Sequence, residues 1–288
     1  MSYALALNSS NVTGPNNSVF QYTFVNGSFV ARDAEIALSS ASIPYSWYNI
    51  TSINNNQKFT LAFPSGTGFF SILNITLPDG YYDIDDIQNY IEQKCIEYAF
   101  FLVDNNGNYV FYVNFSYNVN YYGVQVLLSA VPTTLPTGWS LPTVGTGMWT
   151  TALPTTGWTP RLTLPATGSI STIIGFAAGA TYPSAATTSS QSFLSTFTPN
   201  GSTVNSIVVR CSIVKNDIGS PTDILDAINI SVPFGSAILY DPSFERWVKI
   251  NDGTYSNITL SLCDQNFNTI YARDPNTSIT LLIRNRRN

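Results

Sequence analysis

The chain contains no histidine among its 288 residues. Histidine is the commonest general acid or base and the commonest metal ligand in proteins. Its absence excludes Ser-His-Asp and Cys-His nucleophilic sites, and zinc would have only cysteines and carboxylates as ligands. The three cysteines, Cys95, Cys211 and Cys263, form no CxxC pair and are too few for a disulfide framework. We therefore predict buried free thiols in a reducing compartment.

Charged side chains are also scarce. They make up 10% of the chain, against about 25% in an average soluble domain. Between Asn105 and Val209 the one charged residue is Arg161, and Thr, Ser, Gly, Pro, Asn and aromatic residues fill this low-charge stretch. Because charged residues are depleted at the cores of protein interfaces, we expect other protein to cover much of this surface. The net charge of −5 argues against a general nucleic-acid-binding role.

Targeting and membrane signals are missing as well. The N-terminal residues MSYALALNSSNV lack the basic region and the long apolar core of a signal peptide. The longest apolar stretches, such as IIGFAAGA (173–180), are far shorter than the roughly 20 residues that a bilayer requires. We expect a soluble protein that is made in the cytoplasm and has no membrane span.

What the chain has in abundance favours strands. It contains 17 Phe, 17 Tyr and 5 Trp, together with many Val, Ile and Thr, and these residues are typical of β-sheets. Alternating apolar residues predict strands over 35–43, 58–63, 69–77, 99–103, 109–112, 123–131, 206–215, 228–232, 244–250, 257–263 and 278–283.

One helix is predicted over 84–97, because Ile84, Ile87, Ile91 and Cys95 recur at helical spacing after a possible N-cap at Asp83. With no βαβ alternation, the pattern indicates an all-β fold, an antiparallel β-sandwich. The chain length and the long connections favour a single jelly roll with one helix and a long inserted loop.

The domain organisation follows from composition. Residues 1–31 carry no charge and are rich in Asn, Ser and Gly, so we predict an extended N-terminal arm, with room for one strand over 19–25, followed by one jelly-roll domain over 32–288. Prolines fall every few residues between about 132 and 165, which argues against a central strand there. We interpret 132–165 as an ordered loop or small inserted subdomain that interrupts the jelly roll. Its three tryptophans, Trp139, Trp149 and Trp158, indicate that it packs against something.

Several side-chain groups have both a chemical and a structural interpretation. Asp79, Asp83, Asp85 and Asp86 form a cluster of carboxylates that could bind a cation or act as a hydrolase pair, but helix-start chemistry explains all four. Asp104 and the residues after it indicate a hairpin turn. No glycine-rich phosphate loop precedes the helix, so nucleotide binding has no support.

The aromatic and basic residues also leave alternatives open. The three tryptophans could form a sugar-binding platform, although aromatic residues in an all-β chain belong mostly to the core. At the C-terminus, Arg284, Arg286 and Arg287 could contact phosphates or an acidic groove of a partner, or they could simply be solvated.

Four groups of segments carry a resemblance to a known family. In chain order they are AEIALSSASIPYSWYNI (34–50) with KFTLAF (58–63); LPDGYYDIDDIQNYIEQKC (77–95); IIGF (173–176); and SIVVRCSIVKN (206–216), followed by ILDAI (224–228), NITLSLCDQN and SITLLIR. In this order and spacing they resemble the penton, or vertex, capsid proteins of virophages, polinton-like viruses and related large DNA viruses of eukaryotes. The resemblance spans residues 34–284.

The resemblance implies a structural capsid protein, a homopentamer that closes the fivefold vertices of an icosahedral shell. Its partners would be further copies of itself and the major capsid protein of the same virus, and its location the virion. It implies no catalytic residues, cofactor, metal or small-molecule substrate. Two alternatives remain open: a host-glycan or receptor-binding spike module with the same fold, and a minor capsid protein away from the vertex.

Candidate interface residues are Arg161, the three tryptophans, and the three C-terminal arginines. We expect Arg161 to reach solvent at a loop tip or to pair with an acid of an adjacent subunit, because an unpaired buried charge would cost several kcal/mol.

Overall fold

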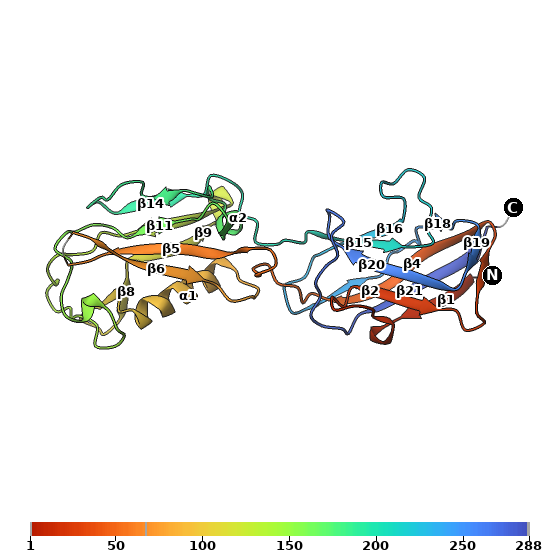
Figure 1. Cartoon of the computed structure of the whole chain (residues 1–288), viewed down its shortest axis with the longest axis horizontal. Helices are drawn as coiled ribbons and strands as arrows, with labels where there is room; N and C mark the ends of the chain where they lie inside the picture. The colour runs from red at the N-terminus through yellow and green to blue at the C-terminus, as the bar shows by residue number, and fades with distance from the viewer. Residues whose placement is uncertain (1, 67, 287–288) are drawn as a thin grey trace. The chain divides into compact units, whose positions relative to one another are not determined.

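The structure is a computed structural model that describes residues 2–66 and 68–286, so Arg287 lies outside the described residues. The chain divides into two compact units. The terminal unit consists of Met1–Trp47 and Thr203–Asn288, and the inserted unit is Tyr48–Ser202. Both are built from β-sheets (Figure 1). The predicted fold class, all-β with antiparallel sheets and one long helix, is confirmed.

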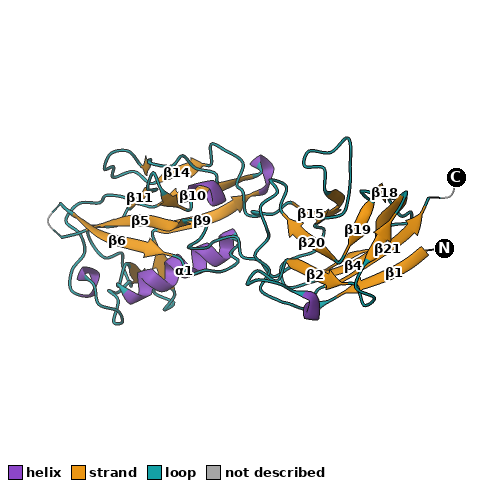
Figure 2. Cartoon of the chain, turned by 45° about the vertical axis from the view of Figure 1, so that its right-hand side comes forward, coloured by secondary structure: helices purple, strands orange, loops and turns teal. Residues whose placement is uncertain are grey.

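The terminal unit contains two larger sheets, which form the layers of a sandwich (Figure 2). One has the strand order β1-β21-β4-β17, with β18 also paired to β4, and the other has the order β16-β15-β20-β2. Every pairing in them is antiparallel. Their strands are β1 Ser2–Leu7, β2 Val19–Thr23, β4 Ala34–Pro44, β15 Ser206–Cys211, β16 Ile224–Asn229, β17 Ala237–Tyr240, β18 Val248–Lys249, β20 Asn257–Cys263 and β21 Ser278–Asn285. A small ribbon pairs β3 Phe29–Ala31 with β19 Gly253–Tyr255.

The first strands of the chain belong to this sandwich. Strand β1 pairs with β21 along its whole length, and β2 pairs with β20. Strand β2 falls within the one strand expected in the arm, over 19–25, whereas β1 lies in a sheet where an extended arm was expected. Uncharged segments such as Ser2–Leu7 can complete a sheet because backbone groups, rather than charged side chains, provide the pairing.

The inserted unit has its own two sheets and a short hairpin. In the first, β5 Asn56–Pro64 pairs with β6 Phe70–Thr76 on one side and with β11 and β12 on the other. The second has the order β14-β10-β9. The remaining elements are β7 Phe101–Val103, β8 Tyr109–Phe111, β9 Val113–Asn118, β10 Gly123–Leu128, β11 Arg161–Thr163, β12 Gly168–Ser169, β13 Thr181–Tyr182, β14 Gln191–Leu194, helices α1 Ile84–Glu97 and α2 Ser171–Ile174, and the 3-10 turns η2 Val119–Tyr121 and η3 Met148–Thr150.

Helix α1 has the bounds that the sequence predicts. Asp83 is its N-cap, and Asp86 completes a capping box: the amide N–H of Asp86 donates to Asp83 Oδ1 at 2.8 Å and that of Asp83 to Asp86 Oδ2 at 3.1 Å. The helix buries Ile87, Ile91 and Cys95 in the core of the inserted unit. Both views show it beside β6 (Figures 1 and 2).

The proline-rich segment 132–165 is part of a larger insertion. In the sequence, residues 48–202 are inserted between β4 and β15, two consecutive strands of the two larger sheets of the terminal unit. Within it, residues 145–147 pack directly on the end of α1, where the N–H of Thr146 donates to the carbonyl of Glu97 at 3.0 Å. A Cβ on Gly147 would lie 1.9 Å from the carbonyl oxygen of Tyr98, so only glycine fits there. The segment therefore closes the C-terminal end of the helix.

The IIGF step has a similar local explanation. Gly175 follows α2 with a φ of +74°, the left-handed conformation that commonly ends a helix. Its carbonyl accepts a hydrogen bond from the N–H of Phe197 at 2.9 Å. This step thus reverses the chain after α2.

All three cysteines are buried free thiols, as predicted. Burial raises the pKa of Cys95 to about 12 and that of Cys211 to about 11, and it also raises the pKa of Cys263. Because the thiolate is the reactive form, we expect none of the three to react with a thiol reagent at pH 8 in the native protein. All three should react once the chain is unfolded in urea. Rapid modification of the native protein, counted by mass spectrometry, would contradict this burial.

Candidate assembly surface

The low-charge stretch falls almost entirely within the inserted unit. Seven acidic residues of this unit lie between positions 79 and 104, whereas from 105 to 202 the sequence carries Arg161 alone. All three strands of the sheet β14-β10-β9 lie within residues 105–202 and contain no charged residue. One whole sheet of the unit is therefore uncharged.

The outward side of that sheet is a neutral polar surface. Val113, Phe115, Val124, Val126 and Leu128 point into the core, so the alternate residues face outward. We call this outward side the uncharged face, and it consists of Asn114, Ser116, Asn118, Gln125, Leu127, Ser192 and Leu194.

Cross-strand contacts fix the polar groups of the uncharged face. Gln125 lies opposite Ser116 on one neighbour and Leu194 on the other. Its amide Nε2 donates to Ser192 Oγ at 2.7 Å, and its Oε1 accepts from Asn118 Nδ2 at 2.9 Å. These bonds satisfy polar groups across the strands, so covering them with protein costs less than covering charges.

Exposed tyrosines stand at the turn between β9 and β10. Tyr121 and Tyr122 are 71% and 67% exposed, and Tyr122 makes an edge-to-face contact with Tyr117 at a centroid distance of 6.1 Å. Tyrosine is enriched at protein interfaces because its ring is apolar and its hydroxyl can bond to a partner. The turn therefore places exposed aromatic rings at one end of the sheet β14-β10-β9.

Arg161 is held inside its own chain rather than at a loop tip. It begins β11, its Nε donates to the carbonyl of Pro183 at 3.1 Å, and its Nη2 donates to the carbonyl of Ser184 at 2.7 Å. The guanidinium carbon also lies 5.8 Å from the centroid of the Phe70 ring. The expected loop-tip position of Arg161 thus differs from the structure, because backbone carbonyls and a ring face stabilise the charge within its own chain. Pairing with an acid of an adjacent subunit stays a prediction.

The three tryptophans have separate roles. Trp149 is 1% exposed, and its Nε1 donates to the carbonyl of Pro64 at 3.1 Å, so it belongs to the core. Trp158 stacks on Phe70 with ring centroids 5.1 Å apart, and Trp139 is half-buried against the core cluster. With Trp149 enclosed, the three rings do not provide the shared platform that sugar recognition would need.

Two of the three C-terminal arginines, Arg284 and Arg286, contact one carboxylate. Arg284 Nη2 lies 3.0 Å from Glu35 Oε2, and Arg286 Nε lies 3.2 Å from Glu35 Oε1. The guanidinium of Arg284 also stacks over Trp247, 3.8 Å from the ring centroid. These two arginines thus stabilise the terminal sandwich, where β21 pairs with β4. Neither sequence-based interpretation anticipated this ion pair.

The acidic group before α1 has structural partners. Asp83 and Asp86 form the capping box, and Asp85 lies in the first turn. Asp79 Oδ1 accepts hydrogen bonds from the amide N–H of Ser52 at 2.8 Å and from Gln57 Nε2 at 2.9 Å. The helix-start interpretation is therefore confirmed for Asp83, Asp85 and Asp86, whereas Asp79 bonds to Ser52 and Gln57. Across the described residues, no group of three or more Cys, Asp or Glu side chains is placed to hold a metal ion.

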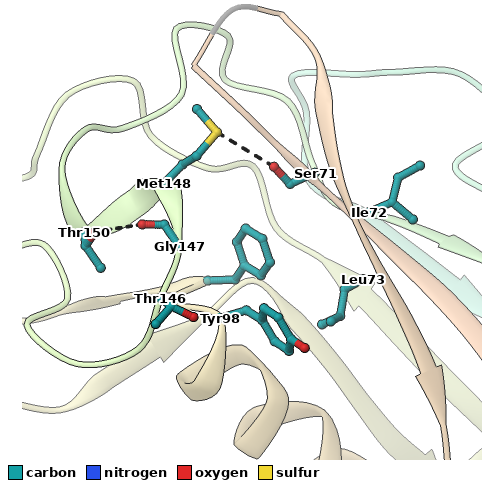
Figure 3. Close-up of a pocket in the computed structure, with 9 residues that line it drawn as sticks. Ser71, Ile72, Leu73, Tyr98, Thr146, Gly147, Met148 and Thr150 are labelled. Atoms are coloured by element: carbon teal, nitrogen blue, oxygen red, sulfur yellow. Dashed lines mark hydrogen bonds between the residues drawn. The ribbon is translucent and has the colours of Figure 1, made fainter.

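A cavity of about 610 Å³ lies beside β6 (Figure 3). Strand β6 contributes Ser71, Ile72 and Leu73 to its lining, and Tyr98 and Met148 lie on the opposite side. The hydroxyl of Ser71 contacts the sulfur of Met148 at 3.9 Å. Every lining residue is uncharged.

The sequence located the low-charge stretch, but it predicted neither the uncharged face nor the cavity beside β6. The alternation of Val124, Val126 and Leu128 with outward residues was a usable signal for one strand. Strand β14 was not predicted, because Gln191–Leu194 is short and lies among serines and threonines. The uncharged face could not be assembled without it.

Fold and surface together define an all-β protein with an uncharged outer sheet face. No protein-family model and no curated protein sequence matches the chain. Among solved structures, it is similar to the crystal structure of the SeMet-labelled penton protein of mavirus, with 9% sequence identity and a TM-score of 0.46 over 99% of both chains. A likeness at this level carries no argument about function. Within the described residues, no helix is long and apolar enough to cross a membrane.

Proposed function

We propose that this protein is a structural capsid protein that assembles with copies of itself into a homopentamer at the fivefold vertices of an icosahedral virus shell. The uncharged face carries this proposal. Interface cores are depleted in charged residues, and this face presents only amides, hydroxyls and two leucines. The proposed vertex location and the proposed number of five subunits rest on the order of the sequence segments, which resembles that of penton proteins.

Association removes water from the side chains that an interface covers. An exposed charge costs several kcal/mol to bury without a partner, whereas paired amides and hydroxyls lose little. The inserted unit would therefore be favoured to associate through the sheet that bears no charge. A ring of five uses two different surfaces of each copy, so the uncharged face would meet a second, non-identical surface of its neighbour. The major capsid protein of the same virus would surround the ring.

The experiment is to measure the mass of the purified chain in solution. We expect sedimentation velocity at tens of micromolar to give a species of five copies. A strict monomer at every concentration tested would overturn the proposal. A discrete dimer would retain self-association but reject the fivefold vertex.

A further inference from the structure

Strand β6 has an open edge. Among the strands of residues 2–66 and 68–286 it pairs with β5 alone. Two backbone hydrogen bonds bracket this ladder: the N–H of Leu77 donates to the carbonyl of Gln57 at 3.0 Å, and that of Ser65 donates to the carbonyl of Phe69 at 2.7 Å. Because backbone groups alternate sides in an antiparallel pair, those of Ser71 and Leu73 face β5, and those of Ile72 and Asn74 point away from it.

This edge has none of the usual protection. Natural edge strands are shortened or carry lysine, proline or a bulge, which prevents another strand from adding to them. The sequence of β6, FSILNIT, has no charge and no proline, and its seven pairs with β5 continue without a register shift. Ile72 is 67% exposed, and Phe69 just before the strand is 70% exposed.

The other sheet of the same unit shows how such an edge can be covered. Along the outer edge of β9, the side chain of Gln88 takes the place of a neighbouring strand. Its Oε1 accepts from the N–H of Phe115 at 2.8 Å, and its Nε2 donates to the carbonyl of Val113 at 3.3 Å. No corresponding side chain bonds to the outward backbone groups of β6 in the described part of the chain. The cavity beside Ser71, Ile72 and Leu73 occupies that side instead.

A second open edge belongs to the uncharged face. Strand β14 pairs only with β10 among the described strands, and the N–H of Ser195 donates to the carbonyl of Val124 at 2.8 Å. The same alternation therefore directs the backbone groups of Ser192 and Leu194 outward. Both residues are members of the uncharged face, so this edge continues the surface proposed for assembly.

We infer that β14 of a second copy of this chain pairs with the open edge of β6 and continues its sheet. The inference rests on the proposed self-assembly and specifies its contact. Strand addition provides backbone hydrogen bonds, with side-chain pockets on alternate residues. Neither β14 nor the lining of the cavity carries a charge, so no charge is desolvated. Joining β6 to β14, two different edges, allows a ring to close, whereas joining β6 to β6 would give only a two-fold dimer.

Amide hydrogen exchange tests this contact directly. In the assembled protein we expect the amides of Ile72 and Asn74 to exchange roughly 100-fold more slowly than in the dissociated protein. The amides of Ser71 and Leu73, already bonded to β5, provide the internal control and should be protected in both states. Assembly without added protection at Ile72 and Asn74 would overturn the strand pairing and leave the proposed function standing. A chain that never associates would overturn both.

A matched pair of variants gives an independent measurement. Ile72→Pro replaces the side chain and removes an N–H that points away from β5, so it should keep the pairing with β5 while blocking an incoming strand. Ile72→Ala keeps the N–H and removes the side chain. We expect Ile72→Pro to weaken association at least about tenfold more than Ile72→Ala, with the folded state of each checked by circular dichroism. Equal association of the two folded variants would contradict the inference.

Discussion

Replacing Trp149 with alanine is expected to lower the free energy of unfolding of the inserted unit by about 3–5 kcal/mol, the largest single-residue effect that we predict. The indole ring makes edge-to-face contacts with Phe63, Phe100 and Tyr112 at centroid distances of 6.0, 5.6 and 5.6 Å. The substitution would leave a cavity among these rings and would remove the hydrogen bond to the carbonyl of Pro64. Equilibrium urea unfolding, followed by circular dichroism, measures the loss.

Trp158→Ala provides the matched control. Trp158 is half-buried and its principal ring contact is the stack on Phe70, worth about 0.5–1.5 kcal/mol beyond its buried area. We therefore expect a clearly smaller loss than for Trp149. If the two variants unfolded at the same urea concentration, the assignment of Trp149 to the core would be wrong.

The double substitution Leu127→Lys and Leu194→Lys is expected to convert the assembled protein into monomers. Both leucines are exposed on the uncharged face, so the free monomer should fold as before. In the assembly, two ammonium groups would be covered without partners, at a cost of several kcal/mol. A loss of about 2.7 kcal/mol already weakens association roughly 100-fold. Sedimentation velocity at the concentration at which the parent chain assembles checks this outcome.

The control for this pair is a charge placed elsewhere on the surface. Leu239→Lys makes the same change on β17 of the terminal unit, where Leu239 is 75% exposed and lies on neither the uncharged face nor the β6 edge. We expect it to leave the assembly largely intact. If the double lysine variant assembled as tightly as the parent chain, the uncharged face would not be an interface.

Elements whose signals are local could be predicted well. The helix over 84–97 was predicted with its N-cap, because the cap and the apolar repeat are both contained in that segment. The strands around Ile258 and Ile279 were predicted because alternation along one strand is enough to identify them. The segment 244–250 was predicted as a strand, yet only Val248–Lys249 pairs with a neighbour. There the alternation was present, but it did not show whether a partner strand was available.

The partners of particular side chains could not be predicted. Arg161 appeared isolated in sequence, yet carbonyls 22 and 23 residues away accept its hydrogen bonds. Glu35 is 249 residues from Arg284 and meets it only because β4 and β21 lie side by side. The extent of the insertion was equally hidden, because strands that alternate apolar and polar residues look the same whichever sheet they enter.

The sequence by itself determined the class of fold, the helix with its cap, the buried thiols and the scarcity of charge over residues 105–209, where Arg161 is the one charged residue. All of these depend on composition or on spacings within one segment. Only the tertiary structure decided which strands share a sheet, that Gln125 lies between Ser116 and Leu194, and that β6 and β14 keep open edges. The physical reason is that backbone hydrogen bonds between strands are made by groups common to every residue, so the sequence does not label their partners.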